Sequence, residues 1–199
     1  MRYSILAGLG TLLLMSGSSQ AHFELLEPSA SLVQDRLGDP QKLAPCGGTS
    51  ANPGTPTGSV NQVRGGDLLH IKLRETIFHP GHYRIALARS AAELPPDPEV
   101  TTRDTPKGPW SVSAKVADAT PPILADGLFA HTQKAAPDTF WETDVRVPNI
   151  NCDDCILQLV QFMAEHGHNK DGDYSYHHCA VMRITANPAL PTDKAWLKP

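Results

Sequence analysis

The chain contains 199 residues, of which 40% are hydrophobic and 19% are charged, and its formal net charge is −4. This length and this balance suit one globular domain with a buried core. The sequence has no basic run, no interleaving of basic and aromatic residues and no zinc-finger spacing, so we expect no nucleic-acid partner.

The first 21 residues have the pattern of a secretory signal peptide. Arg2 provides the positive start, Ile5–Met15 forms the apolar run, and Ser19-Gln20-Ala21 is a small-x-small cleavage site. The apolar run is shorter than a membrane span, and no cysteine follows it that could carry a lipid. We therefore expect an exported protein, secreted or periplasmic, without a membrane anchor. Cleavage of 21 of the 199 residues leaves 178.

Cleavage after Ala21 would make His22 the first residue of the mature protein. Its α-amino group would have an ordinary pKa of roughly 8, and its imidazole one of roughly 6.5. Both nitrogens lose a proton easily to a metal ion, and both belong to one chelate ring. His22 is therefore a candidate metal ligand, although some residue must follow any cleavage site.

Short apolar or alternating segments recur between prolines and glycines after the signal peptide, while helical patterns are nearly absent. We predict an all-β domain over residues 22–186, an antiparallel β-sandwich with long irregular loops, and a loosely ordered tail over residues 187–199. Gln41–Thr57 is predicted to be irregular, and Ser90–Thr139 to hold short helices or a surface loop. The last two strands form a hairpin, because residues 169–173 between them have strong turn chemistry. The predicted strands are Phe23–Glu27, Ser59–Val63, Leu68–Arg74, His82–Arg89, Glu142–Val147, Cys155–Met163 and Tyr174–Ala186.

The chain has four cysteines, Cys46, Cys152, Cys155 and Cys179. An even number in an exported chain favours disulfides over free thiols, and four cysteines allow three connectivities. A Cys-x-x-Cys pair can also indicate redox catalysis or half of a zinc site, but no βαβ pattern surrounds this one. We favour a local Cys152–Cys155 bond together with a long-range Cys46–Cys179 bond.

Nine histidines are many for this length, and several are grouped. Residues 79–82, His-Pro-Gly-His, form a turn that enters a strand, where His79 can project from the open end of a sandwich. With the amine and imidazole of His22 it would give three nitrogen ligands in a plane, an arrangement that copper favours over zinc. His82 is the alternative ligand, but it falls within the strand. We interpret the remaining single histidines as structural, namely His70, His131, His166 and His168.

Four segments together resemble the copper-dependent lytic polysaccharide monooxygenases and their chitin-binding type-4 relatives. His22-Phe-Glu-Leu-Leu-Glu-Pro28 is similar to the start of these proteins. Ile77-Phe-His79-Pro-Gly81-His-Tyr83 is similar to the segment that carries their second copper histidine. Pro148–Gln158, with its Cys-x-x-Cys-x-Leu-Gln pattern, and Tyr174-Ser-Tyr176-His-His-Cys179-Ala180 resemble two of their strands.

The resemblance implies an immunoglobulin-like β-sandwich that binds one copper ion. The amine and Nδ1 of His22 and Nε2 of His79 would be ligands, Tyr176 would lie on the copper axis, and these three residues would form the catalytic centre. A disulfide of relatives would match Cys46–Cys179. An external electron donor would reduce the copper, which would then use O₂ or H₂O₂ to oxidise a C–H bond beside a glycosidic bond. The expected substrate is an insoluble polysaccharide such as chitin or cellulose, and the expected state is a monomer.

The sequence departs from these relatives at one position that bears on activity. Many of them have Gln or Glu two positions before the axial aromatic residue, where this chain has Tyr174. His178, Gln158 or Gln161 could supply the polar group instead. Two alternatives to a glycan-oxidising enzyme therefore stay open. One is a non-catalytic copper protein for periplasmic or extracellular acquisition or delivery, and the other is a structural or glycan-binding module without a metal.

Overall fold

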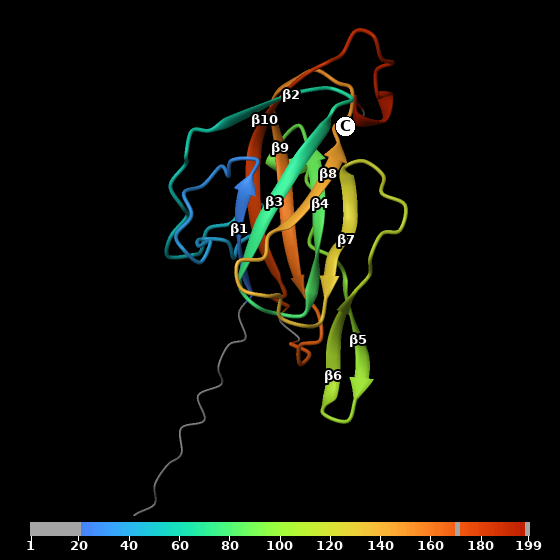
Figure 1. Ribbon diagram of the computed structural model, residues 1–199. Helices are drawn as coiled ribbons and strands as arrows, with labels where there is room; N and C mark the ends of the chain where they lie inside the picture. The colour runs from blue at the N-terminus through green and yellow to red at the C-terminus, as the bar shows by residue number, and fades with distance from the viewer. Residues whose placement is uncertain (1–20, 170–171, 198–199) are drawn as a thin grey trace, which may run out of the picture.

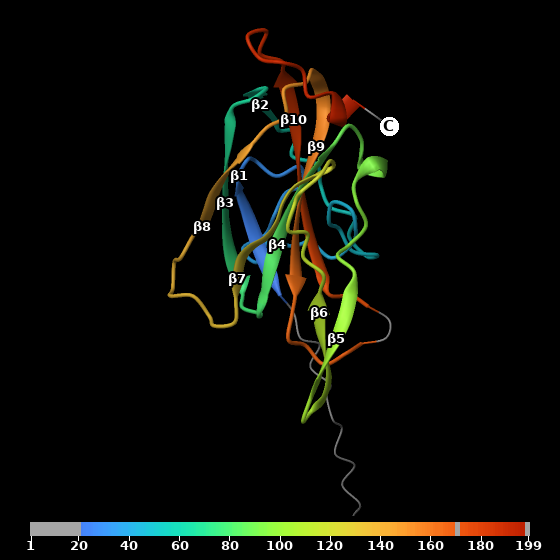
Figure 2. The same cartoon turned by 90° about the vertical axis from the view of Figure 1, so that its right-hand side faces the viewer.

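The computed structural model describes residues 21–169 and 172–197, so the predicted signal peptide lies outside the described residues except for Ala21. Two β-sheets lie face to face, and the view in Figure 2 separates them as two layers. One sheet has the order β1 (His22–Glu27), β3 (Leu68–Ile77) and β8 (Trp141–Arg146). The other has the order β2 (Val60–Arg64), β10 (Ser175–Thr185), β9 (Cys152–Met163), β4 (Gly81–Ala88) and β7 (Ile123–His131).

A separate two-stranded hairpin projects beyond one end of the sandwich (Figure 1). It consists of β5 (Val100–Thr105) and β6 (Gly108–Ser113). The other regular elements of the described ranges are two short 3₁₀ helices, Ala91–Glu93 and Lys194–Leu197. Within those ranges, no helix has the length and apolar character needed to cross a membrane.

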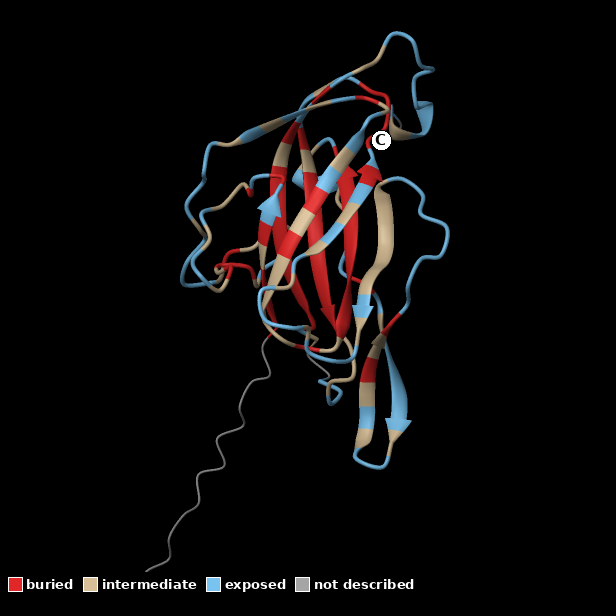
Figure 3. Cartoon of the chain, in the orientation of Figure 1, coloured by how far each residue is buried: buried red, intermediate tan, exposed pale blue. Residues whose placement is uncertain are grey.

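The hydrophobic core lies between the two sheets, because alternate residues of each strand point toward the opposite layer. Phe23 of β1 and Leu73 of β3 are fully buried on one side, as are Tyr83 of β4 and Leu159 of β9 on the other. The rings of Phe23 and Tyr83 meet edge to face, with their centroids 5.3 Å apart, and so join the two layers. Figure 3 shows the buried residues concentrated along these facing strands.

The predicted all-β sandwich is confirmed, and each of the seven predicted strands is present with its ends shifted by a few residues. β9 and β10 pair antiparallel as predicted, with Ser175 opposite Phe162. One pairing differs from the prediction of an antiparallel fold. β2 runs parallel to β10, so the five-stranded sheet is mixed.

The prediction for Ser90–Thr139 is wrong over three strands, β5, β6 and β7. β5 has the sequence VTTRDT and is largely exposed, so no apolar alternation marks it as a strand. β7 contains Gly127 at a φ of 67° and pairs with β4 through several register shifts. Such irregularities interrupt the period of two on which strand prediction depends.

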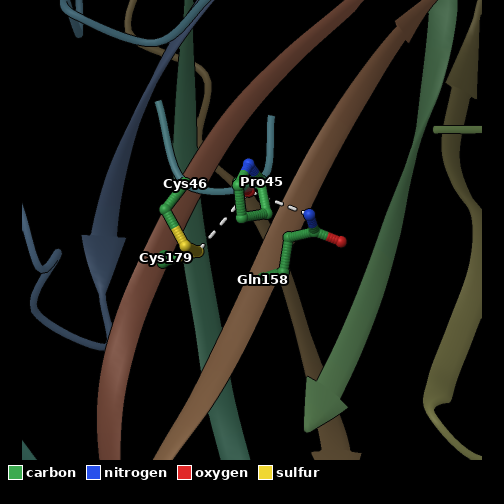
Figure 4. Close-up of a disulfide and its surroundings, with 4 residues drawn as sticks. All are labelled: Pro45, Cys46, Gln158 and Cys179. Atoms are coloured by element: carbon green, nitrogen blue, oxygen red, sulfur yellow. Dashed lines mark hydrogen bonds between the residues drawn. A yellow bond between two sulfur atoms is a disulfide. The ribbon is translucent and has the colours of Figure 1, made fainter. Parts of the chain in front are cut away.

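Both predicted disulfides are present, Cys152–Cys155 at the start of β9 and Cys46–Cys179 between an irregular segment and β10. Figure 4 shows the second bond together with Pro45, whose carbonyl accepts a hydrogen bond from Nε2 of Gln158 at 2.8 Å. The irregular segment that carries Cys46 is therefore attached to both β9 and β10.

The sequence predicts a loosely ordered tail from Asn187, but the buried side chain of Asn149 holds the first part of it. Nδ2 of Asn149 donates to the carbonyl oxygens of Asn187, Leu190 and Pro191 at 3.1, 3.0 and 2.9 Å. Trp196 then packs against the core. The carboxylate of Asp193 accepts the backbone N–H of Asn149 as well, so several polar contacts tie this segment to the sandwich.

The two disulfides should differ in their contribution to stability. Loop-closure entropy predicts about 5 kcal/mol for a bond as long-range as Cys46–Cys179 and about 2 kcal/mol for Cys152–Cys155, in the unstrained limit. Replacing Cys46 and Cys179 together by alanine should therefore lower the free energy of unfolding by more than replacing Cys152 and Cys155 together. Denaturant unfolding of both double variants without reductant measures this difference, and equal losses would contradict it.

Candidate metal centre

Strand pairing brings the predicted ligands toward one end of the sandwich. His22 begins β1 and pairs with Ile77, the last residue of β3. His79 lies two residues later, in the turn between β3 and β4, which connects the two sheets. Tyr176 lies near the start of β10, and its ring centroid is 5.0 Å from that of His22. The pairing of β1 with β3 thus places the first strand residue next to the turn that carries His79.

The imidazole of His22 has one nitrogen engaged and one nitrogen unpaired. Its side chain is 6% exposed, and Nε2 lies 3.1 Å from Oδ2 of Asp39. A carboxylate only accepts hydrogen bonds, so in the neutral ring the proton lies on Nε2 and Nδ1 keeps its lone pair. Nδ1 is buried and has no hydrogen-bond partner within the described residues. This state fits a metal ligand that binds through Nδ1.

His79 has the complementary arrangement. Its Nδ1 donates to the carbonyl oxygen of Pro80 at 2.9 Å, which leaves the lone pair on Nε2. Burial lowers the pKa of this imidazole, so the ring is neutral at neutral pH. Each ring therefore keeps one lone pair of the kind that suits a metal, on Nδ1 of His22 and on Nε2 of His79.

Tyr176 is fixed against His22 by its surroundings. Burial raises the pKa of its hydroxyl, and a hydrogen bond with the backbone of Ala21 offsets part of that rise. Nζ of Lys42 lies 3.9 Å from the centroid of the ring, on which it makes a cation–π contact. The phenol therefore stays protonated, next to the peptide bond that is predicted to be cleaved.

The described residues contain no group of three or more His, Cys, Asp or Glu side chains arranged to hold a metal ion. The ligand set implied by the sequence has two imidazoles and one amine. Only the two imidazoles are side chains, and the amine forms only on cleavage after Ala21. The arrangement of His22 and His79 is therefore of a different type from a closed site built of three or four side chains.

His82, the alternative to His79, is engaged elsewhere. It follows Gly81 in β4, and its side chain is buried on the side away from Tyr83. Nε2 lies 2.9 Å from Oγ of Ser113 on β6, and 3.9 Å from Oδ1 of Asp126. Burial lowers the pKa of His82 to about 4. These contacts attach β6 to the sandwich and occupy Nε2 of His82 on the β6 side.

The sequence predicts a structural role for His166, but its ring centroid lies 5.6 Å from that of His79. Ser111 of β6 holds its backbone on both sides. The Ser111 N–H donates to the His166 carbonyl at 2.7 Å, and Ser111 Oγ accepts from the His166 N–H at 3.3 Å. The hairpin of β5 and β6 therefore determines where His166 lies. The one feature of the sequence that marks His166 is the His-Gly-His group of residues 166–168, and this group gives no indication of a contact with His79.

Sequence reasoning also missed a buried carboxylate, Glu75 of β3. Its Oε1 accepts from Nε2 of His131 at 3.1 Å, from Nε2 of Gln161 at 3.2 Å and from the backbone N–H of His79 at 3.3 Å. Burial opposes protonation of His131, yet the bond to Glu75 raises its pKa above the ordinary value. The carboxylate thus connects β3, β7 and β9 with the turn that carries His79.

Of the polar groups that could replace a missing Gln or Glu, only Gln161 lies in this network. It is the cross-strand partner of Tyr176. Gln158 donates to Pro45, and Nε2 of His178 bonds to the carbonyl of Phe23 at 3.0 Å. The hydroxyl of Tyr174 is bonded to the backbone of Asn169.

The end of the sandwich therefore carries two imidazoles that each have one bonded nitrogen and one nitrogen available to a metal. His22 lies against Tyr176, and His79 lies against His166. Neither the protein-family models nor the curated proteins include a match to this chain.

Proposed function

We propose that the protein is an exported copper protein in which His22 and His79 hold one copper ion beside Tyr176. The observation that carries this proposal is the buried and unpaired Nδ1 of His22. Leaving a buried polar atom without a partner costs about 1–3 kcal/mol, and a bound metal would remove that cost. The free Nε2 of His79 supports the same conclusion, because its other nitrogen is occupied by Pro80.

The donor set favours copper over zinc. All four cysteines are in disulfides, so no thiolate is available within the chain. Three nitrogen donors, the amine and two imidazoles, suit a tetragonal copper site, whereas structural zinc prefers a closed tetrahedral set. Cleavage after Ala21 would create the amine and also remove the backbone group that contacts Tyr176.

We further propose that the protein resembles lytic polysaccharide monooxygenases in activity as well as in sequence pattern, with an immunoglobulin-like arrangement of strands. Bound copper would supply one-electron redox chemistry at an open coordination position. The protonated Tyr176 would lie beside the bound ion, against His22. Trp110 of β6 forms a β-bridge with Gly167, next to His166, and supports a glycan substrate because it places an aromatic residue near this end. An external reductant would be the electron donor.

The free amine of His22 should be essential for copper binding. We expect the processed protein to bind one Cu(II), and a version with one additional N-terminal alanine to bind at least about tenfold more weakly, a loss of about 1.4 kcal/mol. The reason is that a peptide nitrogen replaces the amine in the chelate. Competition titration against a chelator measures both affinities. Equal affinity would contradict the chelate, and no stoichiometric copper on either protein would favour a metal-free module.

His79 should contribute an imidazole ligand. His79→Ala is expected to weaken Cu(II) binding by about tenfold or more and to remove nitrogen hyperfine structure from the Cu(II) EPR spectrum. His168→Ala, which removes an exposed imidazole, is the matched control and should leave both unchanged. His82→Ala should reduce stability rather than copper affinity, because His82 contacts Ser113 in the interior. A larger loss of copper binding in His82→Ala than in His79→Ala would contradict this assignment.

Activity on a glycan separates the enzyme from a copper carrier that uses the same ligands. Copper-loaded protein incubated with a reductant, oxygen and chitin or cellulose is expected to release oxidised oligosaccharides, detectable by mass spectrometry. Copper-loaded His79→Ala under the same conditions is the control. Retention of copper without oxidised products on several glycans would favour the carrier.

A further inference from the structure

Residues 39–42, Asp-Pro-Gln-Lys, contact His22, Phe23 and Tyr176 at the candidate metal centre. We refer to them as the 39–42 segment. Asp39 reaches Nε2 of His22 at 3.1 Å. Oε1 of Gln41 accepts from the backbone N–H of Phe23, the residue after His22, at 3.1 Å. Lys42 lies over the ring of Tyr176.

Several contacts hold the 39–42 segment in place. The side chain of Gln41 is fully buried, and its Nε2 donates to the carbonyl of Leu37 at 3.1 Å. The carbonyl of Gln41 accepts from the backbone N–H of His177 on β10 at 2.7 Å. Nζ of Lys42 forms an ion pair with Asp173 at 2.9 Å. The Cys46–Cys179 bond anchors the following residues, so Asp39 is presented to His22 from a fixed backbone.

We infer that Asp39 is a positioning residue of the metal centre, which holds His22 in the tautomer that directs the lone pair of Nδ1 toward the metal. The inference rests on the proposed copper site. A carboxylate that accepts the ring N–H of a ligand histidine fixes both the tautomer and the ring orientation, and raises the basicity of the other nitrogen. Within the described residues Nδ1 has no partner, so no other contact selects this tautomer.

The two histidines of the site are therefore supported differently. His79 is oriented by the carbonyl oxygen of Pro80, a neutral acceptor of the backbone. His22 is oriented by a charged carboxylate on a side chain that is 39% exposed. The negative charge of Asp39 should make the Nδ1 of His22 a stronger metal ligand than the Nε2 of His79. Because the Asp39 side chain is partly exposed, it can be replaced without leaving a cavity in the core.

Three processed variants test the role of Asp39, namely Asp39→Ala, Asp39→Asn and the control Asp144→Asn. Asp144 lies on β8, where it bonds Nδ1 of the exposed His70 at 2.9 Å, so the control removes the charge from the same kind of contact away from the site. Loss of an outer carboxylate of this kind typically weakens metal binding by about 10- to 100-fold. We expect such a loss of Cu(II) affinity in Asp39→Ala, a smaller loss in Asp39→Asn, whose amide oxygen still accepts the N–H, and none in Asp144→Asn.

A second measurement does not require copper. ¹⁵N NMR of the copper-free processed protein near pH 8, above the ordinary histidine pKa of roughly 6.5, reports which nitrogen of His22 carries the proton. The expected result is an Nε2–H tautomer in the unmodified protein and in Asp39→Asn, and a mixture of tautomers in Asp39→Ala. Thermal unfolding of each variant checks that it is folded.

The outcomes separate this inference from the proposed function. Wild-type copper affinity and an unchanged His22 tautomer in Asp39→Ala would overturn the role of Asp39 while leaving the copper site intact. Absence of copper binding in the unmodified processed protein would overturn the proposed function, and the NMR result would then still decide whether Asp39 sets the tautomer. An equal loss of affinity in Asp144→Asn would overturn the inference, because it would show a general effect of charge.

Discussion

The Cys46–Cys179 disulfide fixes an irregular segment of chain against β10, the strand that carries Tyr176. This segment has almost no regular pairing of its own, so the covalent bond and a few buried hydrogen bonds determine where it lies. The same stretch of chain presents Asp39 to His22 and places Lys42 over the ring of Tyr176. The geometry of the candidate metal centre on the His22 side therefore depends on this cross-link, which attaches the segment to β10.

A buried carboxylate has a comparable role on the other side of the centre. Glu75 lies in the interior with its side chain 6% exposed, where an unpaired charge would be costly. Its bonds to His131 and Gln161 compensate for that cost and connect the three-stranded sheet to the five-stranded sheet. Its third bond holds the backbone of His79. The turn between the sheets is thereby fixed by a buried polar contact.

The sequence was sufficient for the parts of the fold that follow local rules. Period-two alternation located β4, β9 and β10, and the parity and spacing of the cysteines led to both disulfides, which the structure confirms. β5 and β7 escaped prediction because exposed polar residues and a positive-φ glycine hide their alternation. His22, His79 and Tyr176 came from their position and from a resemblance, and their role as copper ligands stays a prediction. His166 could not be assigned to this end, because its contact with His79 depends on how the hairpin of β5 and β6 attaches through Ser111.

By itself, the sequence determined an all-β chain with two disulfides and a histidine placed directly after a cleavage pattern. Strand periodicity and cysteine spacing are properties of neighbouring residues, so they can be read without knowing which strands are paired. Only the tertiary structure decided which nitrogen of each imidazole is occupied. Asp39 bonds the ring of His22 and Glu75 bonds the ring of His131, in each case across a long stretch of sequence, whereas Pro80 directly follows His79. The tautomer of His22 follows from a contact between residues 17 positions apart, which exists only once the 39–42 segment is held against β10.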